Sequence, residues 1–444
     1  MLLSKRYDWG GKMKRKIYLN QNVYDAAQER IKFIFDEFER VCVSFSGGKD
    51  STVVLNLAID EARKRCRKVD ATFIDLEAFY QLTIDHVQKM FEDNKDVVRP
   101  TWICLPMESN NSLSAHEPTW IWWEQGRENI WVRPMPQNEW VVNIDNQKLP
   151  FYDPNKIITF ERFVVDYNDY LAADQKTAVL LGLRTDESLN RFRAIVADKT
   201  KYKGRHYSTK AGRAWSFSPI YDWHVSDIWT YTAKYNKPYN KLYDLFYRAG
   251  VPISKMRVDE PFGNEAKAGL NMFRVIEPKT WARVVNRVSG ANFGNIYANT
   301  KMLNGQVTLP PGHTWKSFCK FLLSTLPADT AANYRNHFIK FIRYWNKKGC
   351  PMRDDFIGEL ENKHPDAVVN THEFSKRGTG DKEVVRFTKI LDEHPIDRKT
   401  DLLTWRRMCM CILKNDYSCR GLSFSVNKAF TKRGEYLINK YKSL

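Results

Sequence analysis

The residues that most clearly could do chemistry form one short run, Ser46-Gly47-Gly48-Lys49-Asp50-Ser51. It lies between a β-rich apolar run at 41–45 and a segment at 52–62 whose apolar residues recur at helical spacing. A glycine turn between a strand and a helix directs free backbone N–H groups and the positive end of the helix dipole at an anion. The two glycines allow close approach of the backbone, and the serine hydroxyls add donors. The run predicts a phosphate-binding loop, with spacing unlike that of the Walker A loop.

A second group of charged residues follows the apolar run 176–183, which predicts a buried strand. It contains Arg184, Glu187 and Arg191, and the span 184–213 carries nine Lys or Arg residues against three Asp or Glu residues. Guanidinium groups just beyond the carboxyl end of a strand can bind phosphate or sulfate in a bidentate manner. The alternative interpretation is a solvated basic loop.

Strand and helix patterns alternate through the first half of the chain, and these elements must position both groups. Strands are predicted at 41–45, 69–76, 101–106 and 176–183, and helices at 22–38, 52–67, 83–91 and 160–172. This alternation predicts an α/β fold: a parallel sheet with helices on both faces. Asp75 and Glu77 end the second strand, at the carboxyl edge where open α/β sheets bind ligands.

The segment 107–155 interrupts this alternation and is rich in tryptophan and proline. Its tryptophans are Trp120, Trp122, Trp123, Trp131 and Trp140. We interpret the segment as a long insertion folded against the ligand-binding edge of the sheet. Its aromatic rings could stack on a base or could simply belong to the core.

Helical patterns dominate beyond residue 256. They are predicted at 281–288, 315–326, 331–346, 402–414 and 426–442. The sequence therefore predicts two domains: a nucleotide-binding domain at 1–255 that contains the insertion, and a mainly helical accessory domain at 256–444.

Composition limits the classes of partner and the compartment. The 444 residues carry a formal net charge of +18, which favours a polyanionic partner such as nucleic acid, a nucleotide or an acidic protein over a merely soluble basic surface. The sequence shows no apolar run long enough to span a bilayer and no signal peptide, so we expect no membrane association and a cytoplasmic location. Of the eight cysteines, only Cys409, Cys411 and Cys419 are close in sequence; they suggest either structural thiols or a metal or sulfur site.

Three motifs together resemble a known family. The pyrophosphate loop at 46–51, the run Gly182-x-Arg184-x-x-Glu187-Ser188-x-x-Arg191 and the segment Pro219-Ile220-x-x-Trp223 are similar to those of phosphoadenosine phosphosulfate (PAPS) reductases. That family belongs to the adenine nucleotide α-hydrolase superfamily, and the resemblance covers about the first 250 residues. Segments 74–80 and 256–263 look like the IbrA-type subgroup, often encoded on phages and mobile elements beside a ParB-like partner. The C-terminal half looks like the extra domain of that subgroup.

The resemblance implies a site for ATP or a related adenylyl nucleotide, with Mg²⁺. The residues that it assigns to nucleotide binding are Ser46, Gly47, Gly48, Ser51, Asp75 and Glu187, and those that it assigns to catalysis are Lys49, Asp50, Arg184 and Arg191. Asp50 would position the loop or bind the Mg²⁺, and Asp75 would lie near the adenosine. The two arginines would face the distal anionic group, with Glu187 orienting them.

One departure from the family bears on the reaction. PAPS reductases use a thiol from a Cys-Gly tail motif, which this sequence lacks, and the stretch 249–255 has no cysteine where some relatives bind an iron–sulfur cluster. Without a positioned thiol, sulfonucleotide reduction is disfavoured. The first hypothesis is therefore ATP cleavage to AMP and pyrophosphate, which would activate a nucleic acid or a partner protein. The second is a nucleotide-binding regulatory or scaffold subunit that acts with DNA or a ParB-like partner without turnover. The third, a minor one, is PAPS reduction through Cys409 or Cys411.

Overall fold

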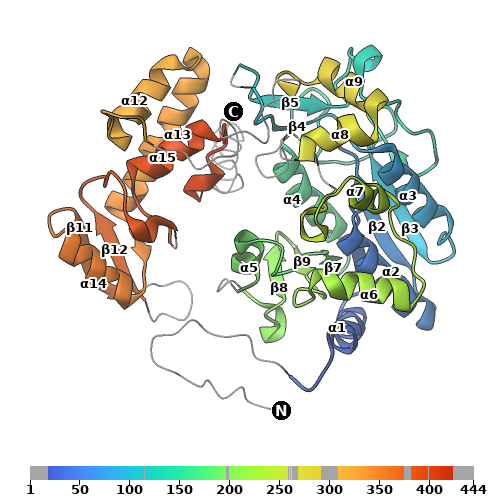
Figure 1. Ribbon diagram of the computed structural model, residues 1–444. Coiled ribbons are helices and arrows are strands. Elements are labelled where there is room, and N and C mark those ends of the chain that lie inside the picture. The colour runs from blue at the N-terminus through green and yellow to red at the C-terminus, as the bar shows by residue number, and fades with distance from the viewer. Residues whose placement is uncertain are drawn as a thin grey trace, which may run out of the picture.

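The computed structural model describes residues 19–114, 116–196, 200–258, 260, 262, 269–291, 309–374, 382–398 and 400–423. Figure 1 shows these residues as two bodies: a large one in blue to yellow around the main sheet, and a smaller one in orange and red. No helix among the described residues is both long enough and apolar enough to cross a bilayer.

A seven-stranded sheet organises the larger body, in the order β6-β3-β2-β1-β7-β9-β8. Its strands are β1 (Arg40–Ser44), β2 (Val69–Ile74), β3 (Val98–Ile103), β6 (Val141–Val142), β7 (Thr177–Leu180), β8 (Ser208–Ala211) and β9 (Ala214–Phe217). All neighbours pair in parallel except β8 and β9. The chain adds β2 and β3 on one side of β1 and then returns to place β7 on the other side. The strand order therefore reverses between β1 and β7, and this is a topological switch point, where open α/β sheets bind ligands.

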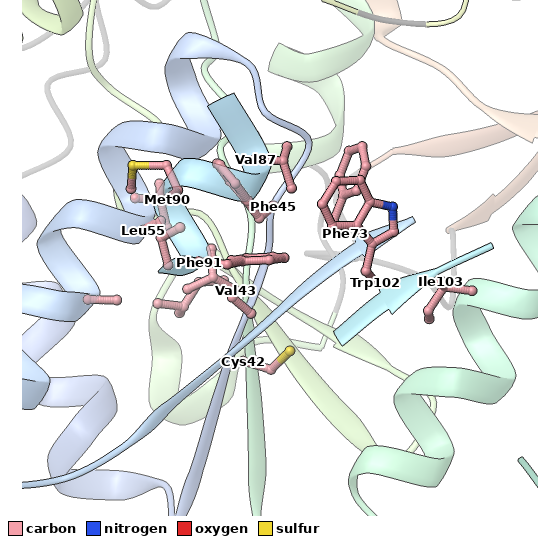
Figure 2. Packing of buried hydrophobic residues seen from close by; sticks show 14 of the residues in the cluster. Cys42, Val43, Phe45, Leu55, Phe73, Val87, Met90, Phe91, Trp102 and Ile103 are labelled. Carbon is pink, nitrogen blue, oxygen red and sulfur yellow. The ribbon is translucent and has the colours of Figure 1, made fainter. Parts of the chain in front are cut away.

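Helices cover both faces of the sheet, as the sequence predicted (Figure 1). They are α1 (Val23–Glu37), α2 (Lys49–Lys64), α3 (Gln81–Glu92), α4 (Phe160–Leu171), α5 (Leu189–Val196), α6 (Val225–Lys234) and α7 (Leu242–Arg248). On one face, the Tyr167 hydroxyl of α4 lies 3.2 Å from Thr72 of β2. On the other, Phe91 of α3 packs on Trp102 and Phe45, as Figure 2 shows at close range.

The tryptophan-rich insertion forms the antiparallel pair β4 (Met107–Asn110) and β5 (Thr119–Trp122) and supplies β6, an edge strand of the main sheet. Trp120, Trp122 and Trp123 are each at most 7% exposed and belong to the main hydrophobic cluster. These three rings therefore belong to the core, which is the second of the two interpretations that the sequence allowed.

The smaller body has its own hydrophobic cluster. Its helices are α12 (Trp315–Thr325), α13 (Ala328–Lys347), α14 (Asp354–Lys363) and α15 (Trp405–Leu413), close to three of the predicted segments, whereas the predicted helix 426–442 lies outside the described residues. The sequence did not predict its antiparallel sheet of β10 (Cys350–Pro351), β12 (Glu383–Phe387) and β11 (Val368–Phe374). β10 is two residues long and β11 has an irregular register beyond Asn370, so neither shows regular apolar alternation.

Residues 269–291 form α8 (Leu270–Ile276) and α9 (Pro278–Arg287), and they pack on the larger body. Leu270 and Val284 are fully buried in the main cluster. The N-terminal core thus recruits residues beyond 255, although the boundary itself remains a prediction.

Contacts also join the insertion to the end of the smaller body. The Asn415 side chain donates to the Ser114 carbonyl (2.7 Å), and the Asn110 side chain donates to the Ser418 hydroxyl (3.0 Å). The insertion therefore lies between the two cores.

Candidate nucleotide-binding site

The loop at 46–51 connects β1 to α2 at the switch point, and two glycines make its path sterically feasible. Gly47 adopts φ +71°, and a Cβ there would meet methyl groups of Thr83 and Val87 at 2.8 and 2.9 Å. Gly182, just after β7, approaches the start of α2 so closely that a Cβ would lie 2.7 Å from the Ser51 nitrogen. Close backbone approach at both positions therefore requires glycine.

Hydrogen bonds within the loop hold it in place. The Gly48 N–H donates to the Ser46 hydroxyl (3.4 Å), and the Ser46 N–H donates to the Ser51 hydroxyl (3.2 Å). The Ser51 hydroxyl in turn donates to the Gly48 carbonyl (3.1 Å). From outside, the buried Asn240 amide donates to the Gly47 carbonyl at 3.0 Å. The two serine hydroxyls, expected as phosphate donors, thus also shape the loop itself.

Several backbone donors of the loop remain available. Within the described part of the chain, the N–H groups of Gly47, Asp50 and Ser51 have no acceptor within hydrogen-bond distance. The Lys49 N–H donates to the Tyr243 hydroxyl (2.9 Å), which here accepts at the first position of α2. Donors clustered at a helix start, where the dipole adds positive potential, form a site for a phosphate.

Two cations and one carboxylate lie beside these donors. Asp50 holds Lys49 on one oxygen (2.9 Å) and Arg184 Nε on the other (2.6 Å). The side chains of Lys49 and Arg184 are 6% and 3% exposed. Lys49 also donates to the Met256 carbonyl (3.3 Å). The arrangement places two buried cations, balanced by Asp50, where a phosphate would meet the loop.

Further carboxylates stabilise the charge of Arg184. Burial would lower its pKa, but the charges of Asp50, Asp186 and Glu187 outweigh that effect and raise it. Glu187 lies 3.9 Å from Arg184 and 3.5 Å from Arg191, whose side chain is about half exposed. Glu187 is therefore near both arginines, and its role in orienting them stays a prediction.

Asp75 lies at the carboxyl end of β2, as predicted, but in a buried structural network. It is 1% exposed, accepts from Trp102 Nε1 (2.8 Å) and is ion-paired with Arg133. Its neighbour Glu77, fully buried, pairs with Arg287 of α9 at 3.0 Å. These contacts fix the insertion and α9 to the sheet edge, and the predicted contact of Asp75 with adenosine stays a prediction.

The cysteines near the sheet are not activated. Burial raises the pKa of Cys42 to about 12, and burial also raises that of Cys104, which lies beside Asp75. Cys66 is exposed, but it follows the far end of α2, a helix of 16 residues or about 24 Å. A reactive thiolate needs a lowered pKa, so neither Cys42 nor Cys104 offers a reductant at the loop, and Cys66 lies too far from it.

The sulfur atoms of the smaller body lie in its core. Cys409, Cys411 and Cys419 are buried free thiols, and the described residues contain no group of three His, Cys, Asp or Glu side chains suited to a metal. Of the two interpretations, structural thiols agree with this burial.

Magnesium must be considered separately, because Asp50 was expected to bind it. Both oxygens of Asp50 are occupied by cations. Mg²⁺ takes one or two carboxylates together with substrate phosphates and water. A Mg²⁺ ion that would arrive on the nucleotide therefore fits the residues present better than a resident ion, and the binding of Mg²⁺ by Asp50 stays a prediction.

Sequence reasoning did not assign Asn240, Tyr243, Met256 or Arg257 to the site, although the last two begin the segment 256–263 that resembles the IbrA-type subgroup. All come from α7 or the chain around it, and the Arg257 guanidinium donates to the Glu187 carbonyl (2.9 Å). This segment closes one side of the loop. The pair Asn240 and Tyr243, three residues apart at the start of α7, was the available signal.

The fold and the loop define a nucleotide-binding domain of the adenine nucleotide α-hydrolase type. Residues 40–249 match the model of the phosphoadenosine phosphosulfate reductase domain, and 250–433 match a domain of unknown function, DUF3440. The Escherichia coli (strain K12) uncharacterized protein YbdN is 37% identical over 422 residues, 93% of each chain. The chain therefore belongs to the PAPS reductase-domain family, in the form that carries a C-terminal DUF3440 domain.

More distant similarities concern parts of the chain. The uncharacterized protein MJ0066 of Methanocaldococcus jannaschii is 27% identical over 232 residues, 51% of this chain and 39% of that protein. The phosphate complex of Candida auris PAPS reductase matches with TM-score 0.28 and 17% identity, over 52% of this chain and 94% of that one. Candida glabrata FMN adenylyltransferase, in complex with FAD and pyrophosphate, matches with TM-score 0.30 and 13% identity, over 50% of this chain and 58% of that one. At these values the two structures carry no conclusion about ligand or reaction.

Proposed function

We propose that the protein binds ATP at the 46–51 loop and cleaves it to AMP and pyrophosphate, thereby activating an acceptor. One observation carries the proposal: the buried cations Lys49 and Arg184 flank Asp50 beside the unpaired N–H groups at the start of α2. Such an array suits several adjacent phosphates better than a single carboxylate ligand.

The chemistry follows from where charge develops. Attack on the α-phosphorus builds negative charge on its oxygens and on the leaving pyrophosphate, and preorganised donors stabilise it. The loop N–H groups and Lys49 would bind the β and γ phosphates, and Arg184, kept charged by its carboxylate neighbours, would face the reacting phosphate. Mg²⁺ carried by the nucleotide would neutralise further charge.

The acceptor is proposed to be a nucleic acid or a partner protein. The net charge of +18 supports a polyanion, and the resemblance to IbrA-type proteins supports a ParB-like partner. A cytoplasmic location agrees with an ATP-dependent reaction of this kind.

The test measures AMP and pyrophosphate formed from α-labelled ATP and Mg²⁺, with and without DNA, RNA or a ParB-like partner. Asp50→Ala removes the carboxylate that orders both cations and should lower turnover at least about 100-fold, the scale for losing one preorganised electrostatic group. Asp50→Asn, which keeps the side-chain shape, guards against a folding defect.

Asp60→Ala is the matched control. Asp60 lies on the same helix and pairs with Lys237 (2.7 Å), away from the loop. Turnover should survive this change. Wild-type rates in both Asp50 variants would refute the role of Asp50.

A nucleotide-binding regulatory or scaffold subunit is the second candidate. It is favoured by the occupied oxygens of Asp50 and by the Tyr243 hydroxyl that already accepts from the Lys49 N–H, a resting arrangement that does not require turnover. ATP binding without AMP formation under every condition would select this candidate. Sulfonucleotide reduction stays a minor one, because Cys409 and Cys411 are buried in the other body.

A further inference from the structure

The long helix α13 (Ala328–Lys347) has two faces of opposite character. Tyr334, Phe338, Phe341 and Trp345, spaced by four, three and four residues, are each at most 4% exposed and form the core of the smaller body. This is the buried stripe expected of an amphipathic helix.

The opposite face carries cations. Lys340, Arg343 and Lys347 each follow a buried aromatic residue of α13 by two positions, and all three are exposed. Because successive residues turn by about 100°, two positions place a side chain about 200° away from that aromatic residue. The three cations therefore form a row along the solvent face, and the exposed Arg335 lies on a flank of the helix about one and a half turns before Lys340.

These cations lack the partners that neutralise other cations of the same body. Among the described residues, no carboxylate lies within 4.0 Å of Lys340, Arg343 or Lys347. By contrast, Arg353 pairs with Asp355 (2.5 Å), Lys363 with Glu359 (2.9 Å), and Lys389 with Asp366 (2.6 Å). The only acidic residue of α13 is Asp329, in its first turn. The solvent face of α13 thus contributes unpaired positive charge to the net +18.

Apolar surface is interleaved with this charge. Ile339 and Tyr344 are 45% and 39% exposed and, at about 100° per residue, lie on the two edges of the row of cations. A purely solvated face would not require exposed apolar side chains between its cations. Alternating cations and apolar groups instead match a partner that offers both phosphates and base edges.

We propose that the solvent face of α13, Arg335 to Lys347, binds double-stranded DNA. A helix with side chains is about 10–12 Å across, which fits a B-DNA major groove about 12 Å wide. The major groove of duplex RNA is too narrow for side chains to read, and this favours DNA. The cations would contact phosphates, with Ile339 and Tyr344 flanking them. This surface is separate from the nucleotide loop, so the proposal does not depend on ATP cleavage.

The test uses the full chain and a fluorescent duplex DNA of about two helical turns. In the variant Lys340→Gln/Arg343→Gln/Lys347→Gln, we expect binding at low salt to weaken at least tenfold. Each lost phosphate contact removes about 0.9 from the slope of log affinity against log salt, so the slope should fall by about 2 to 3.

The matched control is Arg353→Gln/Lys363→Gln/Lys389→Gln, which removes the same residue types and the same charge from the same body. It should bind DNA within about twofold of the wild type, because these three cations lie outside α13 and are already paired with carboxylates. The fold should also be retained, since exposed ion pairs contribute little to stability. Equal weakening in both variants would overturn the proposal, because net charge alone would then explain binding. Binding of duplex RNA or single-stranded DNA as tightly as duplex DNA would also overturn it. Nucleotide cleavage measured without nucleic acid should be unaffected in both variants.

Discussion

The position of Gly47 allows a prediction that separates two physical effects. Gly47 has φ +71°, and an added Cβ would lie 2.8 Å from Thr83 Cγ2 and 2.9 Å from Val87 Cγ2. Gly250 has a similar φ of +78° but nothing within 4 Å of the Cβ position. Gly47→Ala therefore adds steric overlap to backbone strain, whereas Gly250→Ala adds strain alone.

The magnitudes follow from these contacts. A left-handed backbone destabilises an alanine by about 1–2 kcal/mol, which is the whole effect expected at Gly250. Overpacking adds about 1–3 kcal/mol, and the stiff β-branched side chains of Thr83 and Val87 cannot rotate away freely. Gly47→Ala should therefore lower the free energy of unfolding by about 2–5 kcal/mol.

The assay is denaturant unfolding followed by tryptophan fluorescence, which reports on the core that contains Trp102. Nucleotide affinity is measured alongside, because a displaced loop should also lose ATP binding in Gly47→Ala and keep it in Gly250→Ala. If the two variants were destabilised within about 0.5 kcal/mol of each other, the limit of additivity, the close packing of the loop against α3 would be refuted.

The remaining predictions concern buried charge and pH. Arg287→Met leaves the fully buried Glu77 without its cation and should lower the free energy of unfolding by about 3–5 kcal/mol. The control Arg99→Met breaks the exposed pair with Asp70 and should lower it by less than about 1 kcal/mol. Equal shifts in the melting temperatures of the two variants would contradict this prediction. Burial lowers the pKa of His86 to about 4 in the folded protein, because the charged imidazolium is disfavoured there. The contribution of neutral His86 to the free energy of unfolding is therefore present above its unfolded pKa near 6.5 and is lost as the pH falls toward 4. Between pH 7 and pH 4, the free energy of unfolding should therefore fall by about 3 kcal/mol more for the wild type than for His86→Gln. An equal fall in both proteins would contradict this prediction.

The fold was largely predictable because local and long-range signals agree in the first half of the chain. The apolar run before Ser46 and the glycine turn after it specify strand, loop and helix without help from distant residues. The same holds for the strand before Gly182. Parallel strand order then brings these two segments together, so the meeting of Lys49, Asp50 and Arg184 follows from the topology.

Other features depend on tertiary contacts that periodicity does not reveal. Asp75 and Glu77 look alike in the sequence as sheet-edge carboxylates, yet both are buried by partners from 58 and 210 residues away, Arg133 and Arg287. Tyr243 reaches the loop from 194 residues away. The small sheet of the second body escaped prediction because its strands are short or irregular and carry no regular alternation.

The pairing of Glu77 with Arg287 also bears on how such chains can be divided and recombined. The two family models meet at residues 249 and 250, so this pair joins a residue of the first to a residue of the second. A fragment that ended at the first model would leave Glu77 without its counterion and uncover the apolar surface under Val284. Gene fusion or exchange of the C-terminal region would therefore preserve the N-terminal core only if the inherited piece included residues 269–291. The N-terminal structural unit is therefore longer than the span of the first family model.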